Sequence, residues 1–396
     1  MRKVLLLAIA LCLLTAHVPS QAQDEPILVR MVRAVPFAEL SGNTTVSYID
    51  YAALQRALPN SVRPLSFEDF KMLSGTAPVA WYLAGLYNTA AGDANLTQAR
   101  LEGMREAVGF DLFSLDQVLS FGVPPSDGRL YVGRLNAQAV ESAFLARAYT
   151  KVERDGLTVF CGDPNCDPAL ARRVDTQNIR QSDPFGGQLG RREPVALAQN
   201  AILSSPDMRV FDGMIVAYNS GTPSLAQNAF VQALLQALSA EGDVVQAIFF
   251  DSYVIGPVSP NETGIPPYSM AALVHVLAAD GEQPVFIALV YASEREAQAA
   301  AAGLPERIQR YQSVATRRPF LDLLTLSNGS LAPARLVQSA NVPVVLLLPI
   351  RSPAPTGIPA EREANVGYRP TGALTVFRTL ARALLVGDLG FLAVAR

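Results

Sequence analysis

The sequence predicts an α+β protein of two loosely similar halves, each a mainly antiparallel sheet with helices packed on one face. Two hairpin signals support this fold class, because the turn dipeptides Asp155-Gly156 and Asp280-Gly281 each join two apolar segments. Around the first hairpin the expected elements follow the order β-α-β-β, which is one half of a ferredoxin-like sandwich. In the second half strands again lead into a covering helix, so the two halves are alike in plan.

Composition limits the class of protein. Half of the 396 residues are apolar and 17% are charged, which is typical of a globular chain with two or three domains. The formal net charge is −3, and without Arg2 and Lys3 it becomes −5, with 30 basic residues against 35 acidic ones. The sequence has no run of Lys or Arg that reverses this balance locally. It therefore shows no electrostatic footprint for nucleic acid or for anionic lipid.

Residues 1–22 have the layout of a secretory signal peptide. Arg2 and Lys3 precede an apolar run at residues 4–16, and Ser20-Gln21-Ala22 supplies small residues for a cleavage site. The apolar run is too short to span a bilayer, which takes about 20 residues. We therefore expect export, with cleavage near Ala22 and no transmembrane helix in the mature chain.

The segment 183–194 is rich in Gly, Pro and charge and is the best candidate for a domain boundary. The expected organisation is an N-terminal α+β domain at 23–182, a linker or surface loop at 183–194 and a C-terminal α+β domain at 195–396.

In the first half a strand is expected at 45–49, and Asp50 is placed to cap a helix at 51–58. Four short helices are then expected, at 66–73, 81–87, 96–108 and 114–120. A strand at 129–135 follows, Asn136 caps a helix that ends near Ala148, and the first hairpin pairs 149–154 with 157–161.

In the second half short strands at 195–203 precede two helices, one opened by Asp207 and one capped by Ser224. The later elements are a strand at 244–251, a hairpin of 270–279 with 285–292, a helix at 293–311, a buried strand at 342–350, a helix at 375–385 and a strand at 391–395.

Two stretches carry a family resemblance. Ala201–Leu238 (AILSSPDMRVFDGMIVAYNSGTPSLAQNAFVQALLQAL) and Arg134–Phe160 (RLNAQAVESAFLARAYTKVERDGLTVF) resemble a loose group of exported bacterial proteins of unknown function. In such proteins a strand is followed by a helix, then by SLA and a second helix. The resemblance implies export and an α+β fold, and it brings no catalytic residues to this chain.

Cys161 and Cys166 are an even pair in a chain that we expect to be exported, which favours a disulfide. Between and beside them, Asp163, Asn165 and Asp167 place oxygen ligands at alternate positions, as a calcium loop does. Pro168 stands where such a loop needs Gly, and Val174 stands where it needs a bidentate Glu. The alternatives are therefore a calcium site and a polar turn pinned by the disulfide; we expect no other metal and no cofactor.

Residues suited to catalysis are sparse. His275, the one histidine beyond residue 22, is expected to be structural, because it lies within an apolar strand and no nucleophile motif accompanies it. A pair of acids among Asp251, Glu262 and Asp280 would suit glycoside chemistry only if the fold brought two of them together. Aromatic residues cluster at Trp81-Tyr82 and at Phe249-Phe250-Tyr253, as ligand faces or as core.

The sequence favours an exported, non-enzymatic binding or interaction protein of the bacterial cell envelope. An envelope protein, glycan or lipid is the expected partner, and nucleic acid is not. Two alternatives remain open: a carboxylate-dependent hydrolase of envelope glycan or peptide, and a carrier of a lipophilic ligand.

Overall fold

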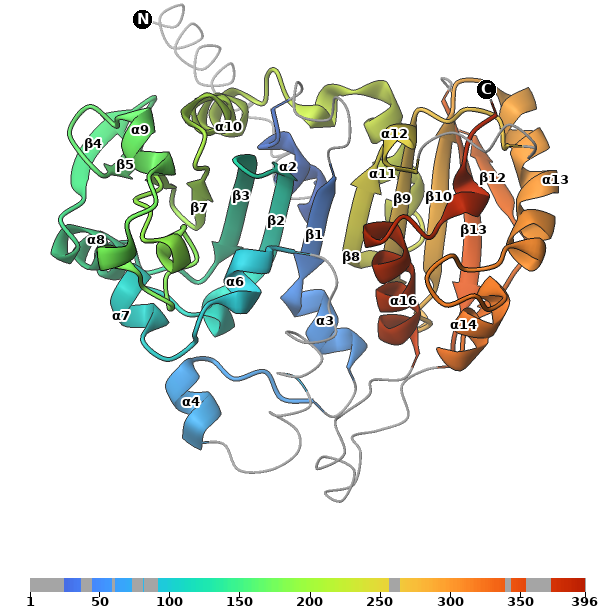
Figure 1. Cartoon of the computed structure of the whole chain (residues 1–396), viewed down its shortest axis with the longest axis horizontal. Coiled ribbons are helices and arrows are strands. Elements are labelled where there is room, and N and C mark those ends of the chain that lie inside the picture. The colour runs from blue at the N-terminus through green and yellow to red at the C-terminus, as the bar shows by residue number, and fades with distance from the viewer. Residues whose placement is uncertain are drawn as a thin grey trace, which may run out of the picture.

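A computed structural model describes residues 25–36, 45–58, 61–72, 81, 92–255, 264–338, 343–353 and 372–395. In these residues thirteen strands form one sheet in the order β11-β13-β10-β9-β8-β1-β2-β3-β7-β6-β5-β4, with β12 also paired to β13 (Figure 1). Every strand pair is antiparallel. The predicted α+β class is confirmed. The predicted signal peptide, residues 1–22, lies outside the described residues.

The first half of the sheet contains β1 (Val46–Asp50), β2 (Leu115–Val123), β3 (Ser126–Gly133), β4 (Thr150–Arg154), β5 (Leu157–Cys161), β6 (Val195–Leu197) and β7 (Ala201–Ser204). Its helices are α2 (Ile27–Arg33), α3 (Tyr51–Ala57), α4 (Phe67–Met72), α6 (Ala94–Gln98), α7 (Met104–Val108), α8 (Ala137–Ala146) and α9 (Pro168–Arg172).

The second half contains β8 (Asp243–Phe250), β9 (Met270–Leu277), β10 (Val285–Tyr291), β11 (Ser330–Leu331), β12 (Arg335–Gln338) and β13 (Val344–Arg351). The helices that follow β7 are α10 (Met208–Ser220), α11 (Ala229–Ser239), α12 (Ser252–Ile255), α13 (Glu294–Arg310), α14 (Phe320–Leu326) and α16 (Ala373–Leu385).

The two halves meet at the antiparallel pair β1 and β8, where Tyr48 lies opposite Ala247. Each of these strands runs into an aspartate that caps the next helix. The Asp50 carboxylate accepts the Ala53 amide at 2.8 Å, and the Asp251 carboxylate accepts the Tyr253 amide at 2.9 Å. Each half then continues with a hairpin, β2-β3 or β9-β10, and a helix, α8 or α13. The halves are therefore alike in plan, as the sequence predicted.

Helices cover both faces of this one sheet (Figure 1). On one face α2, α10 and α11 pack over a continuous apolar core that extends from β5 to β13. On the other face one core lies under α3, α7 and α8, and a separate core lies under α13, α14 and α16. This arrangement differs from two sheets with helices on one face each. Both faces need cover because β10 is apolar along its whole length. Every one of its residues is buried, so neither face of that strand meets solvent.

The predicted boundary at 183–194 lies inside the sheet's connectivity. The strands that follow it, β6 and β7, lie between β5 and β3 in the first half of the sheet. That residues 23–182 and 195–396 fold as separate domains stays a prediction. No helix within the described ranges is long and apolar enough to cross a membrane.

Four sequence predictions of local structure are wrong. The helix expected to be capped by Ser224 begins at Ala229, and Asn228 caps it by accepting the Phe230 amide at 2.9 Å. The helix expected at 114–120 is the strand β2. The helix expected at 96–108 is two helices, α6 and α7, because Gly103 adopts a left-handed conformation (φ 79°) between them. The last strand, 391–395, is a short 3₁₀ turn at Gly390–Leu392 followed by a single bridge from Val394 to Ile265.

Candidate binding site

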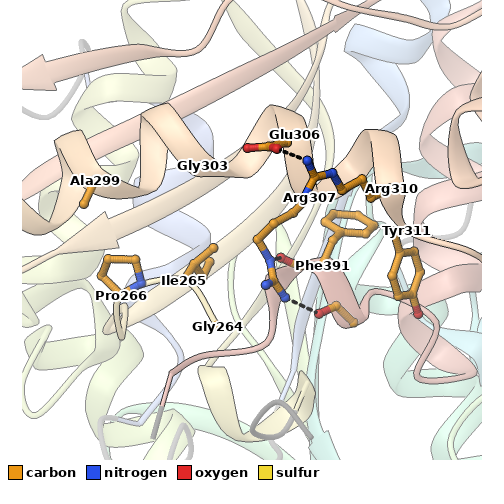
Figure 2. A pocket seen from close by; sticks show the side chains of 11 residues that line it. Gly264, Ile265, Pro266, Ala299, Gly303, Glu306, Arg307, Arg310, Tyr311 and Phe391 are labelled. Atoms are coloured by element: carbon orange, nitrogen blue, oxygen red, sulfur yellow. Dashed lines mark hydrogen bonds and ion pairs between the residues drawn. The ribbon is translucent and has the colours of Figure 1, made fainter. Parts of the chain in front are cut away.

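An open cleft of about 550 Å³ lies between α13, the segment 264–266 and the 3₁₀ turn near the C-terminus (Figure 2). α13 forms where the sequence predicted a helix. Ser293 caps it by accepting the Glu296 amide at 3.3 Å, and the Ser293 hydroxyl donates to the Glu296 carboxylate at 2.8 Å. This reciprocal cap fixes the start of the helix and therefore its rotation over the sheet.

One stripe of α13 lines the cleft. Ala299, Gly303, Glu306 and Arg310 are spaced by four, three and four residues, which places them on one side of a helix. The first two are small. A Cβ atom added at Gly303 would meet no atom within 4 Å, so this part of the floor is open space. The cleft exists because small side chains occupy a helix position where larger ones would fill it.

The opposite wall is held to α13 by hydrogen bonds. Arg307 Nε donates to the Phe391 carbonyl at 3.1 Å, and its Nη2 donates to the Gly390 carbonyl at 3.3 Å. The Ile265 amide donates to the Ala393 carbonyl at 3.1 Å, so segment 264–266 is joined to the same turn. This wall of the cleft is therefore preformed.

A buried carboxylate fixes the aromatic end of the cleft. Asp388 accepts the Tyr311 hydroxyl at 3.0 Å and the Val314 amide at 2.6 Å. The Tyr311 and Phe391 rings meet edge to face with centroids 5.4 Å apart. These contacts hold the Tyr311 ring, packed against the buried Phe391, beside the charged rim.

The rim carries exposed charge. Glu306 and Arg310 form an ion pair at 2.5 Å, with their side chains 60% and 80% exposed, as the dashed line in Figure 2 marks. A pair this exposed holds its partners weakly, by about 0.3–0.5 kcal/mol. The Arg310 guanidinium can therefore exchange Glu306 for an anionic group of a ligand. The arrangement suits a molecule with an apolar body and an anionic end.

A second polar centre is enclosed in the first half of the sheet. Arg129 on β3 is 3% exposed and is surrounded by three carboxylates. Its Nη1 donates to Glu193 at 2.6 Å, its Nη2 donates to Asp127, and its Nε lies 3.5 Å from Asp93, which also accepts the Tyr131 hydroxyl. We call these five residues the Arg129 cluster.

The charges of the Arg129 cluster shift one another. Burial alone would lower the pKa of Arg129, but the summed attraction of Glu193, Asp93 and Asp127 raises it, so the guanidinium stays charged. Burial raises the pKa of Glu193 to about 7, against the attraction of Arg129 and with repulsion from Asp127. These charged groups satisfy one another within the cluster, and we assign them a structural role.

The loop around the two cysteines forms a tight polar turn. The Cys161–Cys166 disulfide is present, as predicted. The Asp163 carboxylate accepts the amides of Asn165 and Asp167 at 2.7 and 2.8 Å, and Asp167 caps α9 through the Ala169 amide at 2.9 Å. In the described part of the chain no group of three His, Cys, Asp or Glu side chains is placed to hold a metal ion. Calcium binding at this turn stays an untested prediction.

The fold does not bring the candidate acids Asp251 and Asp280 together. Asp251 follows the end of β8 that pairs with Ala271, whereas Asp280 lies beyond the opposite end of β9. The eight residues of β9 separate the two by about 25 Å at 3.3 Å per residue. Asp280 instead accepts the Glu282 amide of its own turn at 3.0 Å. Glu262 lies outside the described residues.

His275 has the structural role that the sequence predicted. It is fully buried, its Nδ1 lies 3.4 Å from the Gln246 amide nitrogen, and its Nε2 lies 3.2 Å from the Gln283 amide oxygen. Burial lowers its pKa to about 4, so the imidazole is neutral at physiological pH, and Nε2 donates while Nδ1 accepts.

Most of the candidate aromatic residues are core. Trp81, Phe249 and Phe250 are buried, whereas Tyr253 is 76% exposed. Tyr82 lies outside the described residues. Trp81, Phe249, Phe250 and Tyr253 do not line the cleft at α13, and no sequence pattern beyond the helix itself indicated that cleft.

Comparison with known proteins gives little further guidance. No protein-family model matches the chain, and no curated protein matches it. Among solved structures, crystal form IV of the protein TP0453 aligns with 84% of this chain and 95% of its own, with a TM-score of 0.31 and 9% sequence identity. A likeness this weak carries no argument about function.

Proposed function

We propose that this chain is an exported, non-enzymatic binding protein of the bacterial cell envelope, and that its ligand occupies the cleft beside α13. The observation that carries the proposal is the floor of that cleft, where Gly303 and the small side chain of Ala299 leave open space beside a wall that hydrogen bonds already join to α13. A preformed concave site of a few hundred Å³ or more is the common form of a small-molecule site.

The lining points to a ligand that combines an apolar body with an anionic group. Pro266, Ala299 and the ring of Tyr311 supply apolar surface, and Arg310 supplies a guanidinium that only an exposed ion pair holds in place. A carrier of lipophilic molecules is one form of the same proposal, since a fatty acid has this chemistry.

The test uses the mature chain and the probe 1-anilinonaphthalene-8-sulfonate, which has an aromatic body and a sulfonate. We expect saturable binding at one site, measured by fluorescence titration. Ala299→Trp fills the cleft and should weaken the probe at least about tenfold. Ala302→Trp, on an exposed position of the same helix that does not line the cleft, is the matched control and should leave the affinity unchanged.

A second pair of variants tests the anionic end of the ligand. Arg310→Gln should weaken the probe, and Arg295→Gln, an exposed arginine of α13 outside the lining, should not. Absence of saturable binding, or equal losses in the Ala299 and Ala302 variants, would contradict the cleft as the site. Dodecanoate should displace the probe if the natural ligand is a lipophilic acid.

Export is tested separately by cell fractionation and intact mass. We expect an envelope-fraction protein that begins near Gln23. A cytosolic protein that retains residues 1–22 would refute the envelope part of the proposal and leave the binding part standing.

A further inference from the structure

A small cavity of about 20 Å³ lies at the far end of the sheet from the cleft, beyond the C-terminal end of α8. It is lined by four arginines, Arg147, Arg180, Arg191 and Arg192, together with Tyr149 and Asn178. We call it the arginine notch. The sequence shows no run of basic residues that would reveal it, because three segments of the first half contribute the guanidinium groups.

The Tyr149 hydroxyl is the most informative atom of the notch. Tyr149 is 4% exposed, and its ring is fixed edge to face against Phe144 at 5.0 Å and beneath the Arg147 guanidinium at 5.1 Å. Its hydroxyl is nonetheless buried without a hydrogen-bond partner. An unpaired buried hydroxyl is destabilising by about 1–3 kcal/mol, and native proteins rarely leave one without a protein, water or ligand partner.

A second buried donor accompanies it. The Nε atom of Arg191 is also buried without a partner. Tyr149 remains a donor because burial, with repulsion from Asp183, raises the pKa of its hydroxyl above the usual value. Two donors in one small cavity call for an acceptor, and a space of 20 Å³ holds about one oxygen atom or one water molecule.

The charge around the notch favours an anion as that acceptor. Arg147 is neutralised by a buried ion pair with Asp183. Within the described ranges Arg180, Arg191 and Arg192 have no carboxylate within ion-pair distance, although at longer range Arg180 acts on Asp183 and Arg192 acts on Asp175. Asp175 is itself engaged by Asn178 and by the Gln177 amide. Positive charge therefore exceeds negative charge at the mouth of the cavity.

The loop that carries these arginines is built closely around the notch. Gly190 has φ +67°, and a Cβ atom there would lie 1.8 Å from the Asp175 carbonyl oxygen. The Arg180 amide donates to the Gly187 carbonyl at 2.7 Å, and the Asp175 amide donates to the Leu189 carbonyl at 3.0 Å. These contacts hold Arg180 and Arg191 in place across the cavity.

We propose that the arginine notch binds one phosphate-like oxyanion. One oxygen enters the cavity and accepts from the Tyr149 hydroxyl and Arg191 Nε, and the outer oxygens meet Arg180 and Arg192. The shared chemistry is a phosphoryl group, which inorganic phosphate or a phospholipid headgroup would supply. This site is independent of the cleft at α13 and of the function proposed for it.

The experiment is calorimetric titration of the mature chain with sodium phosphate, against sodium chloride at matched ionic strength. Tyr149→Phe is the decisive variant, because it removes only the hydroxyl and keeps the ring. If the notch binds phosphate, this variant should bind it at least about tenfold more weakly, since a hydrogen bond to a charged group is lost. Its thermal stability without phosphate should be unchanged or higher, because an unpaired buried hydroxyl has gone.

Two arginine variants separate a specific contact from general attraction. Arg180→Gln should weaken phosphate about two- to tenfold. Arg173→Gln removes the same charge from an exposed position that does not line the notch, and it should leave the affinity unchanged.

Vesicles of phosphatidylglycerol distinguish the two sources. Competition between vesicles and phosphate that Tyr149→Phe abolishes assigns a lipid headgroup, and phosphate binding without such competition assigns free phosphate. Either result supports the site. No saturable phosphate binding beyond chloride, or a Tyr149→Phe variant that binds as well as the unmodified chain, would overturn it.

Discussion

The two halves of the sheet share a plan but bury different kinds of side chain. In the first half β3 carries Arg129, which is enclosed with three carboxylates. In the second half the corresponding hairpin strands, β9 and β10, bury apolar residues and one neutral imidazole, His275. Among the described residues, every buried charged side chain except Asp388 precedes Met208.

This difference separates two ways of specifying the same topology. Burial of apolar side chains determines the position of strands such as β10. This interaction is non-directional and tolerates any apolar partner of suitable shape. The Arg129 cluster instead requires Asp93, Asp127 and Glu193, from three separate places in the chain, to reach one guanidinium at the same time. A buried ion cluster adds little net stability but penalises arrangements that leave one charge alone. We infer that it fixes how segment 92–95 and the residues just before β6 are placed relative to β3.

The largest expected effect comes from removing the centre of the cluster. Arg129→Met leaves three buried carboxylates without their cation and should lower the free energy of unfolding by about 3–5 kcal/mol. Urea unfolding of the purified chain measures this. Arg56→Met is the control, because its ion pair with Asp243 is 53% and 66% exposed and should contribute less than about 1 kcal/mol. Equal losses of unfolding free energy in the two variants would contradict the proposed difference between the halves.

The next effect is a pH dependence of opposite sign in the two halves. Glu193 has a folded-state pKa of about 7, above its usual 4.5, so the folded chain binds a proton more readily there. Its contribution to stability is present below pH 4.5 and is lost as the pH rises through 7. His275 has a folded-state pKa of about 4, below 6.5, so its contribution is lost as the pH falls from 6.5 towards 4.

Glu193→Gln isolates the first of these contributions, because His275 is common to both proteins and cancels in the difference. We compare the free energy of unfolding of the variant with that of the unmodified chain at each pH. From pH 4.5 to pH 8 this difference should shift by about 3 kcal/mol in favour of the variant. Urea midpoints at pH 5 and pH 8 measure the change. A difference that does not vary with pH would show that Arg129 compensates Glu193 in full.

The same contrast explains which elements the sequence could predict. The strands of the second half are long apolar runs, so β9, β10 and β13 were predicted nearly at their observed bounds. β2 was mistaken for a helix because polar residues interrupt its pattern and a bulge between Leu115 and Gln117 breaks the period of two. Its polar side chains are satisfied by distant partners, since Gln117 donates to Asp50 and Ser120 to the Gly92 carbonyl.

The two candidate sites depend on contacts that no sequence pattern contains. The helix of α13 was predicted, but the cleft also needs the turn at Gly390–Leu392, which reaches α13 through Arg307. The arginine notch needs Arg147 and Arg191, which lie 44 positions apart in the chain, to share one cavity. Local signals such as the caps Asp50 and Asn136 were predictable because each acts within three residues.

The smallest expected effect lies at the outer edge of the first half, where β5 ends in the disulfide. Replacing both Cys161 and Cys166 by Ala should lower the free energy of unfolding by about 2 kcal/mol, because the bond closes a loop of only a few residues. Amide hydrogen exchange should quicken mainly in β4 and β5, the outermost strands at this edge, while β1 and β8 at the junction of the halves keep their protection. Loss of protection throughout the sheet would show that this edge, rather than the Arg129 cluster, determines the stability of the first half.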